Sequence, residues 1–392
     1  MSNLKLIYLD GHATTPCDPA VVDAMRPYFT EVFGNAASRH HAFGWRARES
    51  VDAARAEIAI LVGAHYKDIV FTSGATESNN LALKGVTDVL GPLAKRDRHI
   101  VTVATEHRSV LDPSVALEAR GFRVTRLTVQ PDGLLALDNL RAAIEPDTVV
   151  VSVMAANNEI GVLQPLAEIG AICRERGVLF HTDAAQAVGK VPIDVEQMNI
   201  DLLSCTAHKI YGPKGIGALY VRRRPRTSLA PQMHGGGHER GLRSGTLNVP
   251  GIVGFGKACA LCRTSMTEES KRLRALRDQL LAGLRAGIPD LHVNGSMENR
   301  LPHNLHVSIP GIDGSALFLA LDDIAVSPGA ACSTASAEPS HVLAALRVDD
   351  DLARASIRFG LTRFTTDGEI DDVVSRLVGL VPHLRAQQAA LR

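Results

Sequence analysis

Residues 148–183 read TVVVSVMAANNEIGVLQPLAEIGAICRERGVLFHTD, and this stretch decides the fold. Two short apolar runs, TVVVSVM (148–154) and VLFHT (178–182), enclose LAEIGAICRER (166–176), which has the amphipathic pattern of a helix. A continuous Val-rich strand has no polar side to present to water, so both of its faces must be covered. The stretch therefore predicts a parallel strand-helix-strand unit.

The same alternation extends through the first two thirds of the chain. A further helix is predicted over 75–90, and further strands are predicted at IVFT (69–72), HIVTVA (99–104), FRVTRLTV (122–129), LLSCT (202–206) and GALYV (217–221). We expect an α/β fold with a mostly parallel sheet, whose ligands bind beyond the carboxyl ends of the strands.

The pattern changes after about residue 260. The charged helical stretch TEESKRLRALRDQLLAGLRAG (267–287) is followed by short strands and a last helix from about Asp367. We predict a large domain over 16–260, and a smaller α+β domain formed by 1–15 with 261–392.

Composition excludes several classes of protein. The 392 residues contain 42 Lys and Arg against 42 Asp and Glu, so no net charge favours nucleic acid or an anionic membrane. The first residues lack the basic and apolar regions of a signal peptide, and no apolar run approaches the roughly 18 residues of a membrane helix. The six cysteines are scattered along the chain, as is typical of reduced thiols, so we expect a cytoplasmic protein. From the charge balance and the lack of a long apolar run, we expect no direct binding to nucleic acid or to a membrane.

Polar residues follow several predicted strands. Lys209 lies in a glycine-rich turn after LLSCT, and Asp183 ends the strand VLFHT. Each has an ordinary alternative, a surface charge for Lys209 and a helix N-cap for Asp183. The segment FTSGATESNN (71–80) passes from strand to glycine turn to helix, which aims the backbone N–H groups of residues 74–76 at a phosphate. His107 and Asn158 follow two other strands.

This set of groups suits one cofactor. Pyridoxal phosphate (PLP) needs a lysine for a Schiff base, an acid beside the pyridine nitrogen and a phosphate site. Lys209, Asp183 and the 74–76 turn offer these groups, and His107 and Gln186 add a flat ring and an amide. The residues alone thus predict a PLP enzyme.

The chain resembles the cysteine desulfurases of the IscS and NifS type, which belong to the class V aminotransferases. The resemblance covers nearly the whole sequence and rests on long segments: FGNAASRHHAFG, FTSGATESNNLA, TEHRSVLD, NNEIGVLQP, DAAQAVGKVPID, AHKIYGPKGIGALYVRR, HGGGHERGLRSGTLNV, ACSTASAEPSHVL and SIRFGLTRFTT. It implies PLP fold type I, similar to aspartate aminotransferase, and conversion of L-cysteine to L-alanine with transfer of sulfur to an enzyme thiol. The sulfur then serves iron–sulfur cluster assembly or the thiolation of cofactors and tRNA.

The resemblance also implies a role for each matching residue. Lys209 would bind PLP and move the substrate proton, Asp183 would pair with the pyridine nitrogen, and His107 would stack on the ring. Gln186 would contact the ring hydroxyl, and Asn158 and Arg358 would grip the substrate carboxylate. The phosphate would be held by Ala75, Thr76, Thr206 and His208, together with Thr246 of a neighbouring subunit, which implies a homodimer with shared sites.

Cys332 stands at the position of the family's nucleophile, in the loop SPGAACSTAS (327–336). There it would carry the persulfide to an acceptor such as an iron–sulfur scaffold protein, and it is also a candidate transient ligand of an iron–sulfur cluster. The helix GIVGFGKACALC holds a lone CxxC pair, Cys259 and Cys262, for which packing is the favoured interpretation. No catalytic metal is expected.

The chain departs from the family pattern in places. Pro328 and Ala330 replace serines in the thiol loop, and proline stiffens it. Gly11 and His12 alter the usual DYSATTP, which leaves His12 either a titratable neighbour of the site or a satisfied structural histidine. These departures concern the acceptor protein more than the chemistry. A selenocysteine lyase, a cysteine-sulfinate lyase and a non-catalytic sulfur carrier remain alternative functions.

Overall fold

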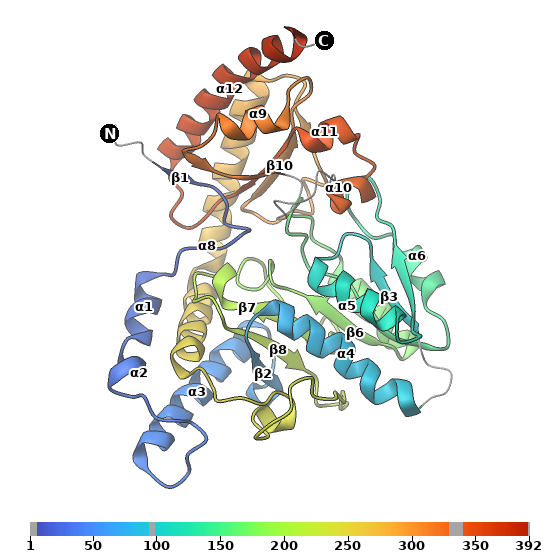
Figure 1. Ribbon diagram of the computed structural model, residues 1–392, viewed down its shortest axis with the longest axis vertical. Coiled ribbons are helices and arrows are strands. Elements are labelled where there is room, and N and C mark those ends of the chain that lie inside the picture. The colour runs from blue at the N-terminus through green and yellow to red at the C-terminus, as the bar shows by residue number, and fades with distance from the viewer. Residues whose placement is uncertain (1–5, 94–98, 329–339, 391–392) are drawn as a thin grey trace.

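The computed structural model describes residues 6–93, 99–328 and 340–390. Its main element is a seven-stranded sheet in the order β2-β8-β7-β6-β5-β3-β4 (Figure 1). The strands are β2 (Ile69–Thr72), β3 (His99–Val103), β4 (Arg123–Leu127), β5 (Thr148–Ser152), β6 (Leu179–Asp183), β7 (Leu202–Thr206) and β8 (Gly217–Val221). Strand β8 runs opposite to the other six strands of this sheet, so the predicted mostly parallel α/β fold is confirmed.

Alternating side chains explain why both faces of this sheet are covered. Val101, Val103 and Val151 belong to one hydrophobic cluster, whereas Ile100 and Val150 belong to another. Successive residues of a strand point to opposite faces, so each face carries its own apolar layer. Helices α4 (Ala75–Leu93) and α5 (Arg108–Glu118) cover one face, and α3 (Ala42–Leu61), α6 (Leu137–Ala143), α7 (Leu166–Arg176) and the start of α8 (Val249–Gly287) cover the other.

A second layer of strands lies beyond the carboxyl ends of the first sheet. Its four strands are β12 (Ser327–Pro328), β13 (Ser356–Gly360), β10 (Asn304–Ser308) and β9 (His292–Val293). Strand β1 (Ile7–Tyr8) pairs with β11 (Ile324–Ala325), and Ile7 and Leu9 join the core beneath the second sheet, so the N-terminal segment packs here. The surrounding helices are α9 (Gly314–Leu319), α10 (His341–Ala345), α11 (Asp350–Arg354) and α12 (Asp367–Ala390), while α1 (Pro19–Met25) and α2 (Pro27–Thr30) lead into the first core.

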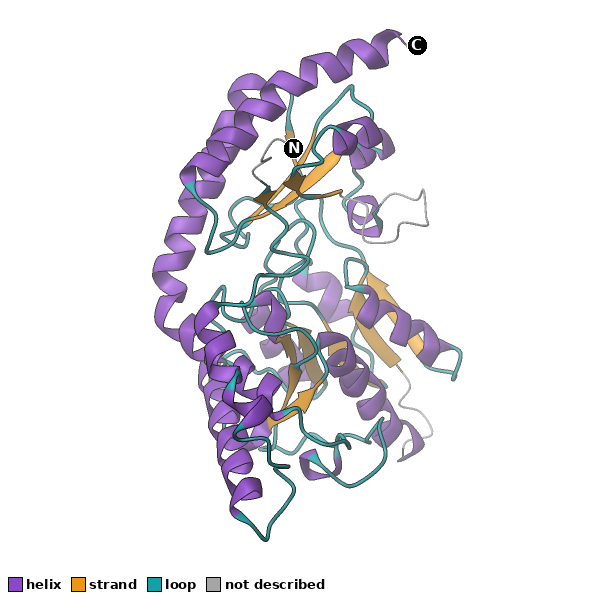
Figure 2. Cartoon of the chain, turned by 60° about the vertical axis from the view of Figure 1, so that its left-hand side comes forward, coloured by secondary structure: helices purple, strands orange, loops and turns teal. Residues whose placement is uncertain are grey.

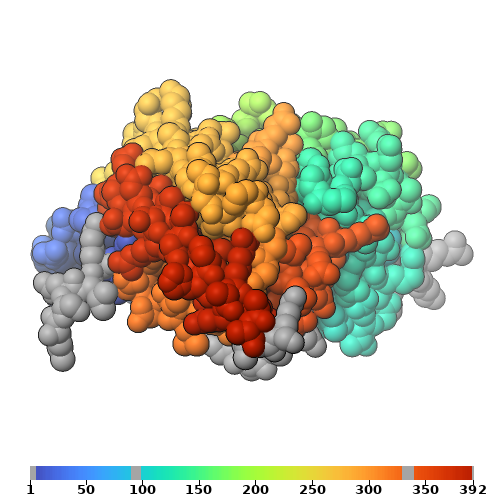
Figure 3. Space-filling view, turned by 90° about the horizontal axis from the view of Figure 1, so that it is seen from above, coloured from blue at the N-terminus to red at the C-terminus, as the bar shows by residue number. Residues whose placement is uncertain are grey.

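Helix α8 connects the two cores. Figure 2 shows it running along the outer edge of both sheets, and Figure 3 shows α12 lying beside its C-terminal part. Cys259 lies in the first core and Leu276 in the second, within one helix. The change in amino-acid composition near residue 260 therefore does not coincide with a break in the helix. The predicted boundary between residues 260 and 261 falls inside α8, and the division into two domains stays a prediction.

Candidate functional site

The turn between β2 and α4 forms an anion cradle. A helix leaves its first backbone N–H groups without intrahelical acceptors, and α4 begins at Ala75, directly after Gly74. A Cβ added to Gly74 would meet only the hydroxyl of Thr206, at 3.8 Å, so the turn is open toward β7. Glu77 closes the outer side by accepting hydrogen bonds from Ser73 N–H (2.7 Å) and from Arg243 Nε (2.7 Å).

Lys209 lies at the end of a single 3₁₀ turn (Ala207–Lys209) that directly follows β7. Its Nζ donates to the backbone oxygen of Ala13 (2.7 Å) and to that of His12, so the amine is held at the cavity by the N-terminal segment. The neighbouring His208 contacts the Thr14 hydroxyl through Nδ1 (3.2 Å). Burial, assisted by the positive charge of Lys209, lowers the pKa of His208 to about 4, so this ring is neutral at physiological pH.

Asp183 ends β6 and is almost fully buried. Its Oδ1 accepts the backbone N–H of Ala185 (2.9 Å), and its Oδ2 accepts a hydrogen bond from Asn79 Nδ2 (2.7 Å). Asn79 reaches it from the second turn of α4 and had no predicted role. The carboxylate is thus fixed in place, as a partner for a protonated ring nitrogen must be.

His107 caps the N-terminus of α5 with its ring. Its Nδ1 accepts the N–H of Ser109 (3.1 Å) and lies 2.8 Å from the Ser109 hydroxyl. That hydroxyl already accepts a hydrogen bond from Asn79 Nδ2 (2.8 Å), so its proton is available for His107 Nδ1. In its neutral form the ring therefore carries its proton on Nε2.

Arg358 enters the site from β13 of the second sheet. It donates to Asp10 (2.8 Å), to the Ser327 hydroxyl (2.8 Å) and to the backbone oxygen of Asn158 (3.0 Å). Its Nε is buried without a hydrogen-bond partner among the described residues. A buried guanidinium with an unmet donor is suited to an anionic ligand, and a carboxylate is the matching group.

These groups converge on one cavity of ≈ 570 Å³ between the two sheets. Ten predicted site residues line it: Ala75, Thr76, His107, Asn158, Asp183, Gln186, Thr206, His208, Lys209 and Arg358. Thr246 is exposed and is not among the described residues that line the cavity. Cys332 lies outside the described residues.

His12 also lines the cavity, and its surroundings decide between the two predicted alternatives. The ring is buried and both of its nitrogens have hydrogen-bond partners, Gln186 and Asn304. Burial and the nearby Arg358 charge lower the pKa of His12 well below its ordinary value. His12 is thus a structural histidine whose two ring nitrogens both have hydrogen-bond partners, and it also lines the cavity.

Two buried acids near the cavity were not predicted. Glu106 precedes His107, and burial together with the Asp183 charge raises the pKa of Glu106 well above its usual range. Burial also raises the pKa of Glu159 to about 7. Each has one carboxyl oxygen without a hydrogen-bond partner among the described residues. The TEH and NNEIG segments contain these residues, but sequence alone does not show their burial.

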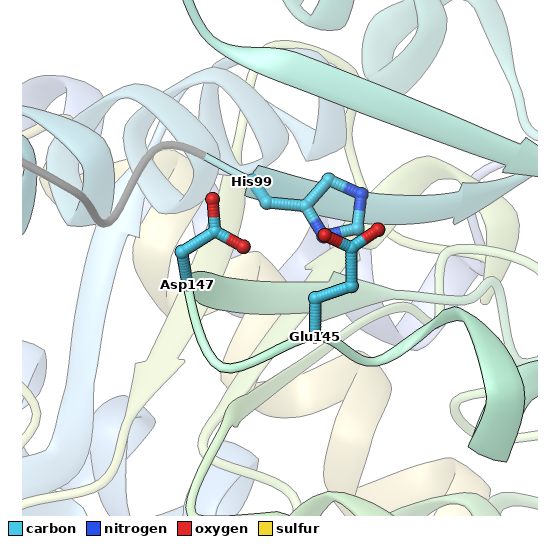
Figure 4. A group of neighbouring side chains, drawn as sticks. All are labelled: His99, Glu145 and Asp147. Atoms are coloured by element: carbon cyan, nitrogen blue, oxygen red, sulfur yellow. The ribbon is translucent and has the colours of Figure 1, made fainter.

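A second group of titratable side chains lies at the opposite end of β3 (Figure 4). His99, Glu145 and Asp147 are close enough to hold a metal ion, but their ligand atoms already have protein partners. Arg123 donates to both acids, at 2.8 and 2.7 Å, and the two ring nitrogens of His99 contact the hydroxyls of Thr148 and Thr125. The group is an ion-pair cluster.

The buried cysteines have the surroundings of packing residues, which was the favoured interpretation of Cys259 and Cys262. Cys173, Cys205, Cys259 and Cys262 are free and buried, and burial raises the pKa of Cys173 and of Cys205 to about 12. Thiols in this state are poor nucleophiles.

The donor set of the cavity fits PLP. The α4 N-terminus with Thr206 offers a phosphate cradle, Asp183 a carboxylate for the pyridine nitrogen, and Lys209 an amine at the same cavity. The open side of Gly74 and the unmet Nε of Arg358 leave room and hydrogen-bonding capacity for a cofactor and an acidic substrate.

Comparisons with known proteins agree with this geometry. The Aminotransferase class-V family model matches residues 7–373. Cysteine desulfurase IscS of Anaeromyxobacter sp. (strain Fw109-5) is 58% identical over 379 residues, 97% of this chain and 93% of that protein. The same enzyme of Methylococcus capsulatus is 56% identical over 97% of this chain and 93% of its own length.

Solved structures show the same similarity. A NifS-like protein superposes with a TM-score of 0.89 at 37% identity, covering 97% of this chain and all of that one. SspA in complex with cysteine gives a TM-score of 0.81 at 36% identity, over 92% of this chain and all of that one. Among the described residues, no helix is both long and apolar enough to cross a membrane.

Proposed function

Because the chain belongs to the class V aminotransferase family and is more than half identical to cysteine desulfurases over nearly its full length, we propose that it is a PLP-dependent L-cysteine desulfurase. The reaction converts L-cysteine and the Cys332 thiol into L-alanine and a Cys332 persulfide. The convergence of Lys209, Asp183 and His107 on one cavity is the structural observation that carries this proposal.

PLP supplies an electron sink for the substrate's Cα when bound. Lys209 would attach it, and Asp183, held by Asn79, would be the carboxylate for its pyridine nitrogen. The N–H groups of Ala75 and Thr76, with Thr206 and His208, would hold the phosphate, and His107 would lie beside the ring; all five residues line the cavity. Gln186 would meet the ring hydroxyl.

The substrate carboxylate binds to Arg358 and Asn158. The unmet Nε of Arg358 is the donor that this carboxylate satisfies, and Asp10 holds the guanidinium in place from the other side. Lys209 moves the Cα proton. His107, with Nδ1 engaged by Ser109, has Nε2 available to exchange a proton with substrate or with the attacking thiol.

On either side of the Cys332 segment, a described serine is hydrogen-bonded to a buried side chain. Ser327 accepts a hydrogen bond from Arg358, and Ser340 donates one to the buried Glu159. In the proposed reaction the thiol of Cys332, which lies outside the described residues, attacks the substrate sulfur. The persulfide then passes to a sulfur-acceptor protein, such as an iron–sulfur scaffold, and serves cluster assembly or thiolation in the cytoplasm.

The functional unit is a homodimer with shared sites. Thr246 is exposed and does not line its own cavity, so it is free to complete the phosphate site of a second subunit. The segment before α3 also exposes large apolar side chains, with Phe29 and Phe33 each 63% exposed, which suits a protein interface.

One preparation tests the activity. The purified protein should be yellow and should release alanine from L-cysteine in the presence of a thiol reductant, and Cys332→Ser should abolish this turnover. Undiminished turnover in that variant would rule out the persulfide step, and a colourless protein that takes up no PLP would rule out the enzyme. Selenocysteine as a second substrate separates a desulfurase from a selenocysteine lyase, because only a lyase would keep selenocysteine turnover in the Ser variant.

A further inference from the structure

A chain of hydrogen bonds links the second sheet to the cavity. Arg300 Nη1 donates to Asn304 Oδ1 (2.8 Å), Asn304 Nδ2 lies 3.0 Å from His12 Nε2, and His12 Nδ1 lies 2.9 Å from Gln186 Oε1. All four side chains are buried, and we call them the Arg300–Gln186 chain. His12 is its central member.

The Arg300 end fixes the direction of these bonds. A guanidinium only donates, so the Asn304 atom that faces Arg300 must be its amide oxygen. The other atom, Nδ2, also donates to the backbone oxygen of Glu159 (3.0 Å), which only accepts. Asn304 therefore donates to His12, and Nε2 of that ring must be unprotonated.

The Gln186 end requires the same direction independently. Gln186 Nε2 donates to the backbone oxygen of His12 (3.1 Å), so Gln186 Oε1 faces the imidazole. An oxygen can only accept there, and His12 Nδ1 must therefore carry the proton. Both ends assign the same tautomer to His12, with Nδ1 protonated and Nε2 bare.

The neutral state of His12 is consistent with this arrangement. Burial and then Arg358 lower its pKa, and Lys209 and Lys190 act in the same direction, whereas the hydrogen bond to Gln186 opposes them. A protonated ring would turn a hydrogen toward the amide of Asn304 and break the chain. The stacked neighbour His303 is also buried, and burial lowers its pKa as well.

We propose that His12 is a positioning residue that fixes the Gln186 amide with its second N–H directed into the cavity. Gln186 lines the cavity, and no acceptor among the described residues takes this hydrogen. The inference rests on the proposed function, since the ring oxygen of PLP is the acceptor that the N–H would meet. Without His12, the amide is free to rotate and to present its oxygen instead.

The first test reads the tautomer of His12 without using the cofactor. Histidine-labelled protein is examined by ¹⁵N NMR as isolated and after removal of PLP, and His12→Asn assigns the signals by their loss. The expected result is a protonated Nδ1 and an unprotonated Nε2 between pH 6 and 8. A proton on Nε2, alone or on both nitrogens, would overturn the proposal.

The second test compares three variants of the PLP-loaded protein by the pH dependence of its visible absorbance. A donated N–H stabilises the ionised ring oxygen, so its loss in His12→Leu should raise the titration midpoint by about one pH unit. His12→Asn, which can still donate to Gln186 from the position of Nδ1, should restore most of the shift. His99→Leu, a buried histidine that also contacts two side chains, should leave the midpoint unchanged.

An unchanged midpoint in His12→Leu would contradict the positioning role. So would a shift in His12→Asn as large as that in His12→Leu. If the protein takes up no PLP, the proposed function fails, and the NMR result still decides whether His12 and Gln186 are oriented as the chain requires.

Discussion

A histidine lies at each end of strand β3, and the two have opposite surroundings. His99 begins the strand, and its ring and the acids near it are satisfied by Thr148, Thr125 and Arg123. His107 follows the strand at the other end and lines a cavity of ≈ 570 Å³. Around that cavity several buried atoms, including Arg358 Nε and an oxygen of Glu159, have no partner among the described residues.

The contrast shows how a ligand-binding site differs from an ion-pair cluster that needs no ligand. Both ends of β3 bring a histidine together with carboxylates, so proximity alone does not distinguish them. Unmet hydrogen bonds are costly when buried, and they persist where a ligand supplies the missing partners. Substitutions at the two ends of the strand should therefore have different effects.

Replacing the cavity lysine should have the largest effect. Lys209→Ala removes the amine that attaches the cofactor, so alanine formation should fall by a factor on the order of 10⁴ or more. The visible absorbance of the purified protein should disappear with it. Steady-state assays and absorbance spectra measure both, and a yellow, active Lys209→Ala would show that the cavity acts in another way.

The buried acid Glu159 should make stability depend on pH. Its pKa is about 7 in the folded protein against an ordinary value of 4.5, so the folded state retains a proton that the unfolded state releases. The free energy of unfolding should therefore fall as pH rises from about 4.5 to 7 and slightly beyond. For a shift of this size the loss is on the order of 3 kcal/mol.

Urea titrations at pH 5 and pH 8 measure that loss. Glu159→Gln keeps the shape of the side chain and removes its titration, so the variant should lose less stability than the wild type over the same interval. Equal losses in the two proteins would mean that Glu159 is already ionised in the folded state at pH 5.

Arg358→Lys should weaken substrate binding. Lysine keeps the positive charge but lacks the planar fork that binds a carboxylate through two hydrogen bonds. We expect the KM for cysteine to rise by roughly 10-fold or more, which corresponds to one charged hydrogen bond. Initial-rate kinetics over a range of cysteine concentrations check this, and an unchanged KM would place the substrate carboxylate elsewhere.

At the satisfied end of β3, His99→Leu should affect only stability. Two buried hydrogen bonds are lost, so the free energy of unfolding should fall by about 1–3 kcal/mol. The kcat/KM for cysteine should stay within about twofold of the wild type at a temperature where both are folded. A large loss of activity without loss of stability would remove the distinction between the two ends.

Local patterns in the sequence predicted most of the elements that build the site. The strands at 69–72, 202–206 and 217–221 and the helix at 166–176 have the expected bounds. The strand expected at 122–129 is shorter, because only Arg123–Leu127 pairs with β3. Apolar alternation determines these elements, and the strand ends then determine where Asp183 and Lys209 lie.

Long-range contacts could not be predicted in the same way. The partners of His12 are 174 and 292 residues away in sequence, so nothing near residue 12 indicates a satisfied ring. Asn79 and Glu106 likewise gain their roles only when α4, β3 and β6 come together around Asp183. The change in composition near residue 260 marked a change of core, but helical hydrogen bonding continues through it.

Helix α8 has a consequence for how the molecule comes apart. Its 39 residues extend about 58 Å at the usual rise per residue, and they contribute side chains to both hydrophobic cores. If one core unfolds, α8 loses the side-chain contacts that it makes there. The helix is then less stable, and so is the other core that packs against it. Heating should therefore give one calorimetric transition, in which the two sheets lose their structure together.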